Sequence, residues 1–159
     1  AITPIRVDAD EVTYNLHIML RFDLEKRLFD GSLEMKDLPD AWNETSERIL
    51  GYRPKNNREG CLQDVHWSGG MIGYFPTYSL GNLMSVPFFN MAVEAHPSIP
   101  AEIGQGQFGT LLGWLQENIY QHGRKYMPAE LYKRVTGEEM SAQPYLAYLR
   151  EKYGTLYEL

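Results

Sequence analysis

The sequence has little of what several classes of protein require. Its 159 residues include a single cysteine, Cys61, so no disulfide can form within the chain. No apolar run approaches the roughly 20 residues that a membrane-spanning helix needs, and no cluster of Lys and Arg accompanies the net charge of -6. The four histidines include no pair at the i, i+4 spacing with which one helix supplies two zinc ligands. These absences argue against a disulfide scaffold, a membrane protein, a nucleic-acid-binding protein and a metal site within this chain.

The residues that are present are typical of a soluble globular protein, with 43% hydrophobic and 23% charged residues. The length suits one domain with a hydrophobic core, and we expect residues 1–159 to form a single helical segment. Charges at Arg6, Asp8 and Asp10 interrupt the N-terminus where a signal peptide needs an apolar stretch. Together with the single thiol, this favours a cytoplasmic location.

Apolar residues at intervals of three and four predict an all-α fold. The longest predicted helix is Asp8–Asp30, where Asp8 or Asp10 can cap the start and Gly31 can end the helix. The other predicted helices are Asp37–Leu50 with a stop at Gly51, Thr77–Ala95 with a kink or break at Pro87, Gln107–Gln121, Pro128–Val135, and Ser141–Tyr153 with a stop at Gly154. The prolines near residues 97–100 indicate a connection.

The stretch Leu62–Tyr78 interrupts the helical pattern with glycines and aromatic residues. We predict a short helical turn at Gln63–Trp67, followed by a tight irregular segment. Three polar residues, Gln63, Asp64 and His66, are concentrated in this turn. A lone histidine is more often a hydrogen-bonded structural residue. However, Gln63 and His66 would share one face of a helical turn, and such a polar group favours a functional site.

Two sequence blocks resemble the carboxypeptidase Taq family of thermostable zinc metallocarboxypeptidases. An I-R-x-x-A-D block stands at Ile5–Asp10, and a G-x-x-Q-D-x-H-W block stands at Gly60–Trp67, both unbroken. The family's H-E-x-x-H zinc motif and its downstream Glu are absent from this sequence. The resemblance therefore implies the C-terminal part of the catalytic domain of a metallocarboxypeptidase, expected to be inactive alone. Zinc, or another divalent metal, would be bound by the intact parent protein and not by this chain.

The resemblance implies two catalytic residues, His66 and Tyr78. Negative charge develops on the substrate carbonyl oxygen during peptide hydrolysis, and a waiting hydrogen-bond donor lowers the barrier. A His N–H is such a donor, and a phenol remains protonated at neutral pH. Tyr74 is the second choice for the phenol, with simple packing as the alternative. Asp64 either holds the imidazole or a nearby backbone group, or it caps a helix.

The expected substrate-binding residues are Arg6, Tyr74, Gln63 and Asp64. The planar fork of an arginine binds a carboxylate through two hydrogen bonds, which suits recognition of a peptide C-terminus. The alternative for Arg6 is a salt bridge to Asp8, to Asp10 or to another helix.

A polar stripe is expected on one face of the first helix, at positions i, i+4, i+7 and i+11: Asp10, Tyr14, His17 and Arg21. It could line a groove, but we favour a structural hydrogen-bond network between packed helices.

The partners implied by the resemblance are a peptide substrate, the missing N-terminal part of the same protein, and a second copy in a homodimer. Neither nucleic acid nor a membrane is expected as a partner. The competing interpretation is a non-catalytic helical binding module. An upstream H-E-x-x-H motif in the parent protein would decide for the enzyme.

Overall fold

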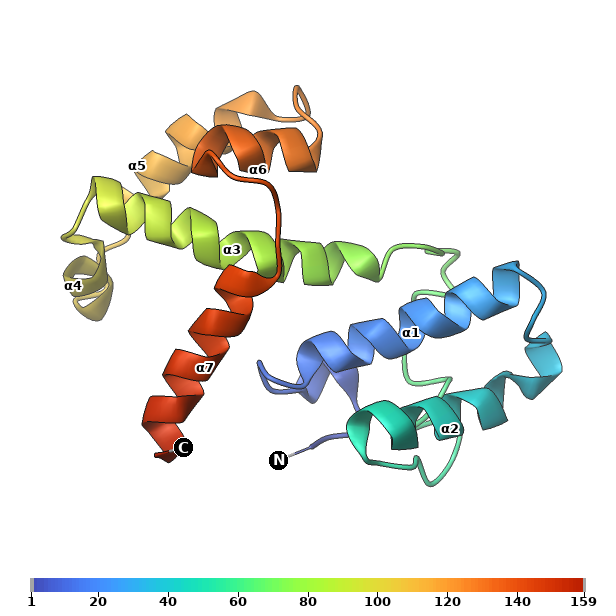
Figure 1. The fold of residues 1–159 in the computed structure, drawn as a ribbon. Coiled ribbons are helices and arrows are strands. Elements are labelled where there is room, and N and C mark those ends of the chain that lie inside the picture. The colour runs from blue at the N-terminus through green and yellow to red at the C-terminus, as the bar shows by residue number, and fades with distance from the viewer. Residues whose placement is uncertain (1, 159) are drawn as a thin grey trace. The chain divides into compact units, whose positions relative to one another are not determined.

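The computed structural model describes residues 2–158, and over these residues it contains helices and no strand (Figure 1). The predicted all-α fold is therefore confirmed. No helix in the described part of the chain is long and apolar enough to cross a membrane.

The chain divides into two compact units, residues 1–80 and 81–159, here called the N-terminal unit and the C-terminal unit. The expectation that residues 1–159 act as a single domain stays a prediction. Each unit has its own hydrophobic core, and the candidate site residues all belong to the N-terminal unit.

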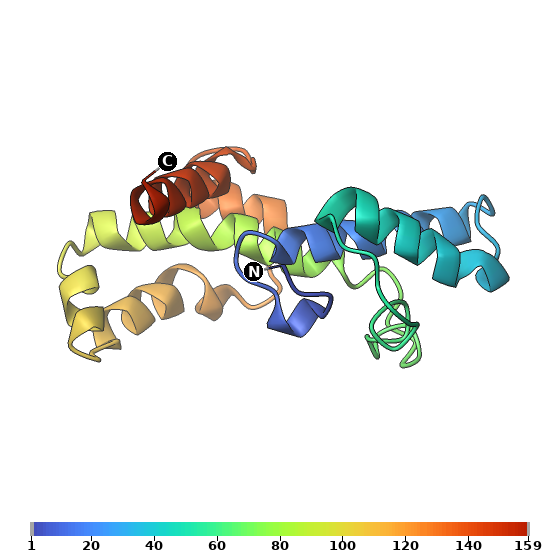
Figure 2. The same ribbon diagram turned by 90° about the horizontal axis from the view of Figure 1, so that it is seen from below.

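The N-terminal unit is built on two helices, α1 (Tyr14–Phe29) and α2 (Leu38–Leu50), which lie side by side (Figures 1 and 2). Short 3-10 turns precede each of them, η1 (Arg6–Asp8) and η2 (Met35–Asp37). The helix α2 ends at Gly51 as predicted, because this glycine adopts the left-handed conformation with φ +67°.

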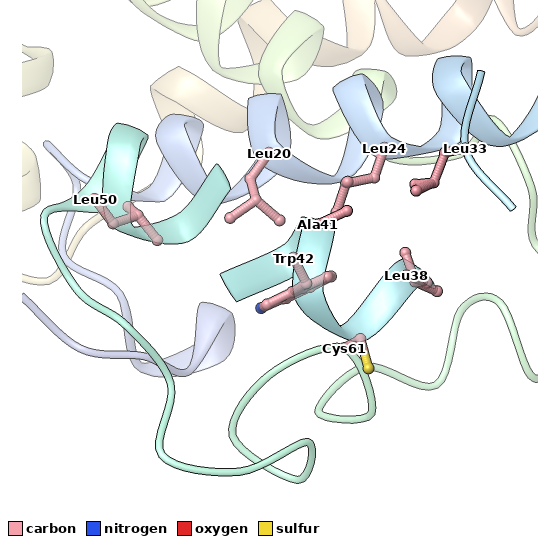
Figure 3. Packing of buried hydrophobic residues seen from close by; sticks show 8 residues of the cluster. All are labelled: Leu20, Leu24, Leu33, Leu38, Ala41, Trp42, Leu50 and Cys61. Atoms are coloured by element: carbon pink, nitrogen blue, oxygen red, sulfur yellow. The ribbon is translucent and has the colours of Figure 1, made fainter. Parts of the chain in front are cut away.

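The core of the N-terminal unit lies between α1 and α2 (Figure 3). Leu20 and Leu24 of α1 are fully buried there, and Trp42 of α2 is 2% exposed. Trp67 packs edge-on against Trp42, with ring centroids 5.9 Å apart. Residues 51–75 contain no helix, so this loop is attached to the two helices through side chains such as Trp67.

The C-terminal unit takes in most of α3 (Pro76–Ala95), which begins in the N-terminal unit. The remaining elements are α4 (Ile99–Gly104), α5 (Gly109–Asn118), η3 (Tyr120–His122), α6 (Pro128–Thr136) and α7 (Gln143–Tyr157). Its core is formed by Phe88, Ala92, Ile99, Trp114 and Tyr132.

The first helix begins later than the sequence indicates. Asp10 does act as a cap, but its Oδ1 accepts the N–H groups of Val12 and Thr13 ahead of the helix, at 3.0 and 2.9 Å. This local turn separates η1 from α1, which begins at Tyr14. The prediction of one helix over Asp8–Asp30 was therefore wrong in its first six residues.

Other predictions also differ from the structure, among them the helix over Gln107–Gln121, which is divided into α5 and η3. The helical turn at Gln63–Trp67 was wrong, because this segment consists of turns and bends. Pro87 does not divide α3, and Gly154 does not end α7. The connection expected near residues 97–100 contains α4, in which Pro100 occupies the first turn, where a missing N–H costs nothing.

Replacing Leu24 with alanine tests the core of the N-terminal unit. We expect the free energy of unfolding to fall by about 2–5 kcal/mol, because a buried leucine leaves a cavity when truncated. Urea denaturation followed by circular dichroism measures this change. Met19→Ala is the matched control, because Met19 lies on the same helix and is 55% exposed. Equal losses in the two variants would contradict the placement of the core.

Candidate active site

The side chain of Asp64 joins three segments of the N-terminal unit. Arg6 binds it with two bonds, Nε to Oδ2 at 2.7 Å and Nη2 to Oδ1 at 3.2 Å. Arg21 of α1 donates from Nε to Oδ2 at 3.0 Å. Nδ1 of His66 lies 2.5 Å from Oδ1. Of the two roles open for Asp64, the structure shows the first, because Asp64 holds the imidazole and caps no helix.

His66 lies between Asp64 and Tyr78. Its Nε2 is 3.0 Å from the hydroxyl oxygen of Tyr78, which stands in the first turn of α3. The imidazole is 6% exposed, and the ring of Phe75 packs on it with centroids 4.5 Å apart. With Nδ1 donating to Asp64, a neutral ring accepts the Tyr78 hydroxyl proton at Nε2, whereas a protonated ring donates from both nitrogens.

Tyr74 lies at the edge of this cluster. It is 45% exposed, and its ring is 5.4 Å from that of Tyr78 and 5.9 Å from that of His66. The structure thus brings together five of the six predicted site residues in one cluster, the imidazole of His66 with Arg6, Asp64, Tyr74 and Tyr78. Their roles toward a substrate stay predictions.

Gln63 is the sixth predicted residue, and all its hydrogen-bonding groups have protein partners. Its Nε2 donates to the carbonyls of Pro4 and Glu59, at 2.8 and 2.7 Å. Its Oε1 accepts the backbone N–H of Arg6 and Nη2 of Arg21, both at 2.9 Å. Any contact with substrate would have to replace one of these bonds, so its main effect here is to join the N-terminal block to the loop.

The charges around Asp64 do not cancel, because two arginines face one carboxylate. Burial acts to raise the pKa of Asp64, but the hydrogen bond from Arg6, the charge of Arg21 and the hydrogen bond from His66 hold that pKa well below its usual range. Burial lowers the pKa of Arg21 to about 10. For Arg6, burial acts to lower the pKa, but the bonds and charge of Asp64 raise it overall. The cluster therefore carries a net positive charge at neutral pH.

Arg21 belongs to the cluster around Asp64, although the sequence analysis named it only as part of the polar stripe on the first helix. Its side chain is 0% exposed, and its Nη1 donates to the carbonyl of His17 at 2.8 Å. Tyr14 accepts from Nη1 of Arg6 at 3.0 Å. These contacts are those of a hydrogen-bonded network. However, this network joins α1 to a loop, whereas we expected it to lie between packed helices.

No group of three or more His, Cys, Asp or Glu side chains within residues 2–158 is arranged to hold a metal ion. The carboxylate of Asp64 is already bound to two arginines and a histidine. The residues of this cluster do not fit a metal centre.

A model of the family described as carboxypeptidase Taq (M32) metallopeptidase matches residues 1–153. The chain belongs to this family. Thermostable carboxypeptidase 1 of Thermus thermophilus is 49% identical over 153 residues, which make up 96% of this chain and 30% of that protein. Carboxypeptidase 1 of Bacillus subtilis is 41% identical over 155 residues, covering 98% of this chain and 31% of that protein.

Solved structures of carboxypeptidases in this family superpose on the chain. The crystal structure of the M32 carboxypeptidase from Deinococcus radiodurans R1 gives a TM-score of 0.93 at 47% identity, covering 100% of this chain and 32% of that one. Metallocarboxypeptidase 1 of Trypanosoma cruzi gives 0.88 at 41% identity, covering 96% and 32%. The chain spans about a third of the length of these relatives and matches their C-terminal portion.

His17 adds a titratable group behind the cluster. It is 1% exposed, and burial together with the positive charges of Arg21 and Arg6 lowers its pKa to about 4. The ring makes a hydrogen bond with the backbone of Thr3, while Nε2 has no partner among the described residues. The folded state therefore holds His17 neutral at pH values where an unfolded chain would protonate it.

We expect the stability of the chain to fall between about pH 6.5 and pH 4.5. In this window the unfolded state takes up a proton at His17 and the folded state does not, so stability rises with pH. The full difference is on the order of 3 kcal/mol. Urea unfolding at several pH values measures it, and the difference from the His17→Gln variant separates the part due to His17 from that of the carboxylates and the other histidines. His17→Gln should flatten the curve, and an unchanged slope in that variant would contradict this account.

Proposed function

We propose that this chain supplies the oxyanion donors and the substrate-carboxylate anchor of a metallocarboxypeptidase. The intact protein would hydrolyse C-terminal residues from peptides, in keeping with its relatives, which are named carboxypeptidases. The observation that carries the proposal is the line of hydrogen bonds from Asp64 through His66 to Tyr78, at 2.5 and 3.0 Å.

This line of bonds suits stabilisation of a developing oxyanion. When His66 is protonated, its Nδ1–H binds Asp64 and its Nε2–H donates toward Tyr78. The hydroxyl proton of Tyr78 is then available for the substrate oxygen. Burial raises the pKa of Tyr78, so the phenol keeps this proton at neutral pH. A carboxylate–imidazole–phenol series of this kind favours the enzyme over a non-catalytic binding module, which needs no proton donor.

The net positive charge around Asp64 supports the proposed carboxylate anchor. Arg6 uses three of its five N–H groups in its hydrogen bonds to Asp64 and Tyr14, and the other two could bind a ligand. Its guanidinium lies 5.3 Å from the Tyr78 ring centroid, so an anion bound to Arg6 would stand beside the proposed donors. Tyr74, half-exposed next to Tyr78, would contact the substrate from the solvent side.

The rest of the intact protein would supply the metal site. We expect a divalent ion, zinc in the first instance, held by residues outside this chain. A homodimer and a cytoplasmic location belong to the same proposal.

In the intact enzyme, Tyr78→Phe and His66→Ala should each lower kcat by about 10²–10³-fold with little change in KM. Both residues act on charge that exists only in the transition state, so its stabilisation is lost without loss of substrate binding. Steady-state kinetics on a blocked dipeptide measures this. Tyr120→Phe, an exposed tyrosine of the C-terminal unit, is the control that should leave kcat unchanged. A normal kcat in Tyr78→Phe would remove Tyr78 from the mechanism.

Arg6→Ala should instead raise KM and abolish the preference for a free over an amidated C-terminus. The reason is that a carboxylate anchor acts already in the ground state. Matched acid and amide peptides separate the two substrates. Because Arg6 also holds Asp64, Arg21→Lys serves as the control: it disturbs the same carboxylate from a position that is fully buried and out of reach of substrate. If Arg6→Ala kept full discrimination, the anchor would lie elsewhere.

A further inference from the structure

The loop that carries His66 is attached to one face of α1 at two points, one helical turn apart. Arg21 and Glu25 stand at positions i and i+4 of α1 and are 0% and 4% exposed. Arg21 bonds Asp64 and Gln63, which precede His66. Glu25 lies where the part of the loop that follows His66 meets the helix.

The carboxylate of Glu25 accepts two donors from the loop. The indole N–H of Trp67 reaches Oε1 at 2.7 Å, and the backbone N–H of Gly73 is 3.2 Å from each oxygen. Trp67 directly follows His66 in the chain and packs edge-on against Phe75, with centroids 6.1 Å apart. Phe75 in turn packs on the His66 ring at 4.5 Å.

Stability alone does not account for this carboxylate. No ion pair of Glu25 occurs among residues 2–158, so its charge is offset by hydrogen bonds only. A buried charge is costly, and well-packed apolar residues at such positions are often neutral or stabilising. A carboxylate that accepts hydrogen bonds from an indole and a backbone amide fixes the orientation of both groups. An apolar side chain cannot do this, because it accepts no hydrogen bond.

We propose that Glu25 is a positioning residue for His66. Its carboxylate holds Trp67 and Gly73 in place. The segment 67–73 that they delimit follows His66 and leads to Tyr78, so it affects the distance from His66 Nε2 to the Tyr78 hydroxyl. Arg21 fixes the loop before His66, and Glu25 fixes it afterwards. The consequence for catalysis rests on the proposed function, whereas the consequence for the geometry of His66 does not.

The test compares Glu25→Leu with Glu25→Gln in the full-length enzyme. The leucine removes both acceptors at similar size. The glutamine keeps Oε1, the oxygen that lies within reach of both donors. We expect Glu25→Leu to lower kcat on the order of 100-fold at nearly constant KM, the effect of a misplaced catalytic group. The Glu25→Gln variant should retain most of the wild-type kcat. Leu50→Ala, which opens the same core and takes part in none of these hydrogen bonds, controls for lost stability.

Two readouts separate positioning from a general structural role. In enzyme carrying His66→Ala, a second change Glu25→Leu should have no further effect on kcat, because Glu25 acts through His66. In enzyme labelled with ¹³C in its histidine rings, Glu25→Leu should shift the His66 signals and Leu50→Ala should not. Unchanged His66 signals, or an equal loss of kcat with and without His66, would overturn the inference. Shifted signals in Glu25→Leu, with normal kcat in both Glu25→Leu and His66→Ala, would support positioning and overturn the proposed function instead.

Discussion

The N-terminal unit depends on the hydrogen bonds and ion pairs that the carboxylate of Asp64 makes. This carboxylate binds Arg6 from the N-terminal block, Arg21 from α1 and His66 from its own loop. Both guanidinium groups are almost completely shielded from water, so each needs a negative partner nearby. Loss of this single carboxylate would leave two buried positive charges without compensation, which costs far more than loss of one exposed ion pair.

Side-chain hydrogen bonds attach the loop over residues 51–75 to the rest of the N-terminal unit. Backbone hydrogen bonds within this loop form only local turns, such as Met71 N–H to the carbonyl of His66 at 2.8 Å, so they do not fix its place on the helices. Gln63, Asp64 and Trp67 are instead each hydrogen-bonded to a group outside the loop. A buried polar network of this kind is rigid only when all of its members are satisfied, and that requirement makes its geometry specific.

Aromatic rings separate the polar cluster around Asp64 from water where it adjoins the hydrophobic core. Arg21 lies over the ring of Trp42 at 4.8 Å, and Phe75 covers the imidazole of His66. The aromatic rings exclude water from the polar groups, which strengthens the bonds among them. Tyr74, at 45% exposed, lies at the edge of this shielded region, and Tyr78 beside it is half-buried.

The sequence by itself determined the fold class, the positions of most helices, the resemblance to the family, and five residues, His66 and four others, that the structure brings together. Helices follow from apolar spacing and from glycines such as Gly51, which act locally, and the motif blocks are contiguous. Only the tertiary structure decided that Asp64 pairs with both Arg6 and Arg21, and that Glu25 receives Trp67 and Gly73. These partners are separated by 42 to 58 residues. No local pattern reports such pairs, because a buried arginine or glutamate looks in sequence like any solvent-facing charge on a helix.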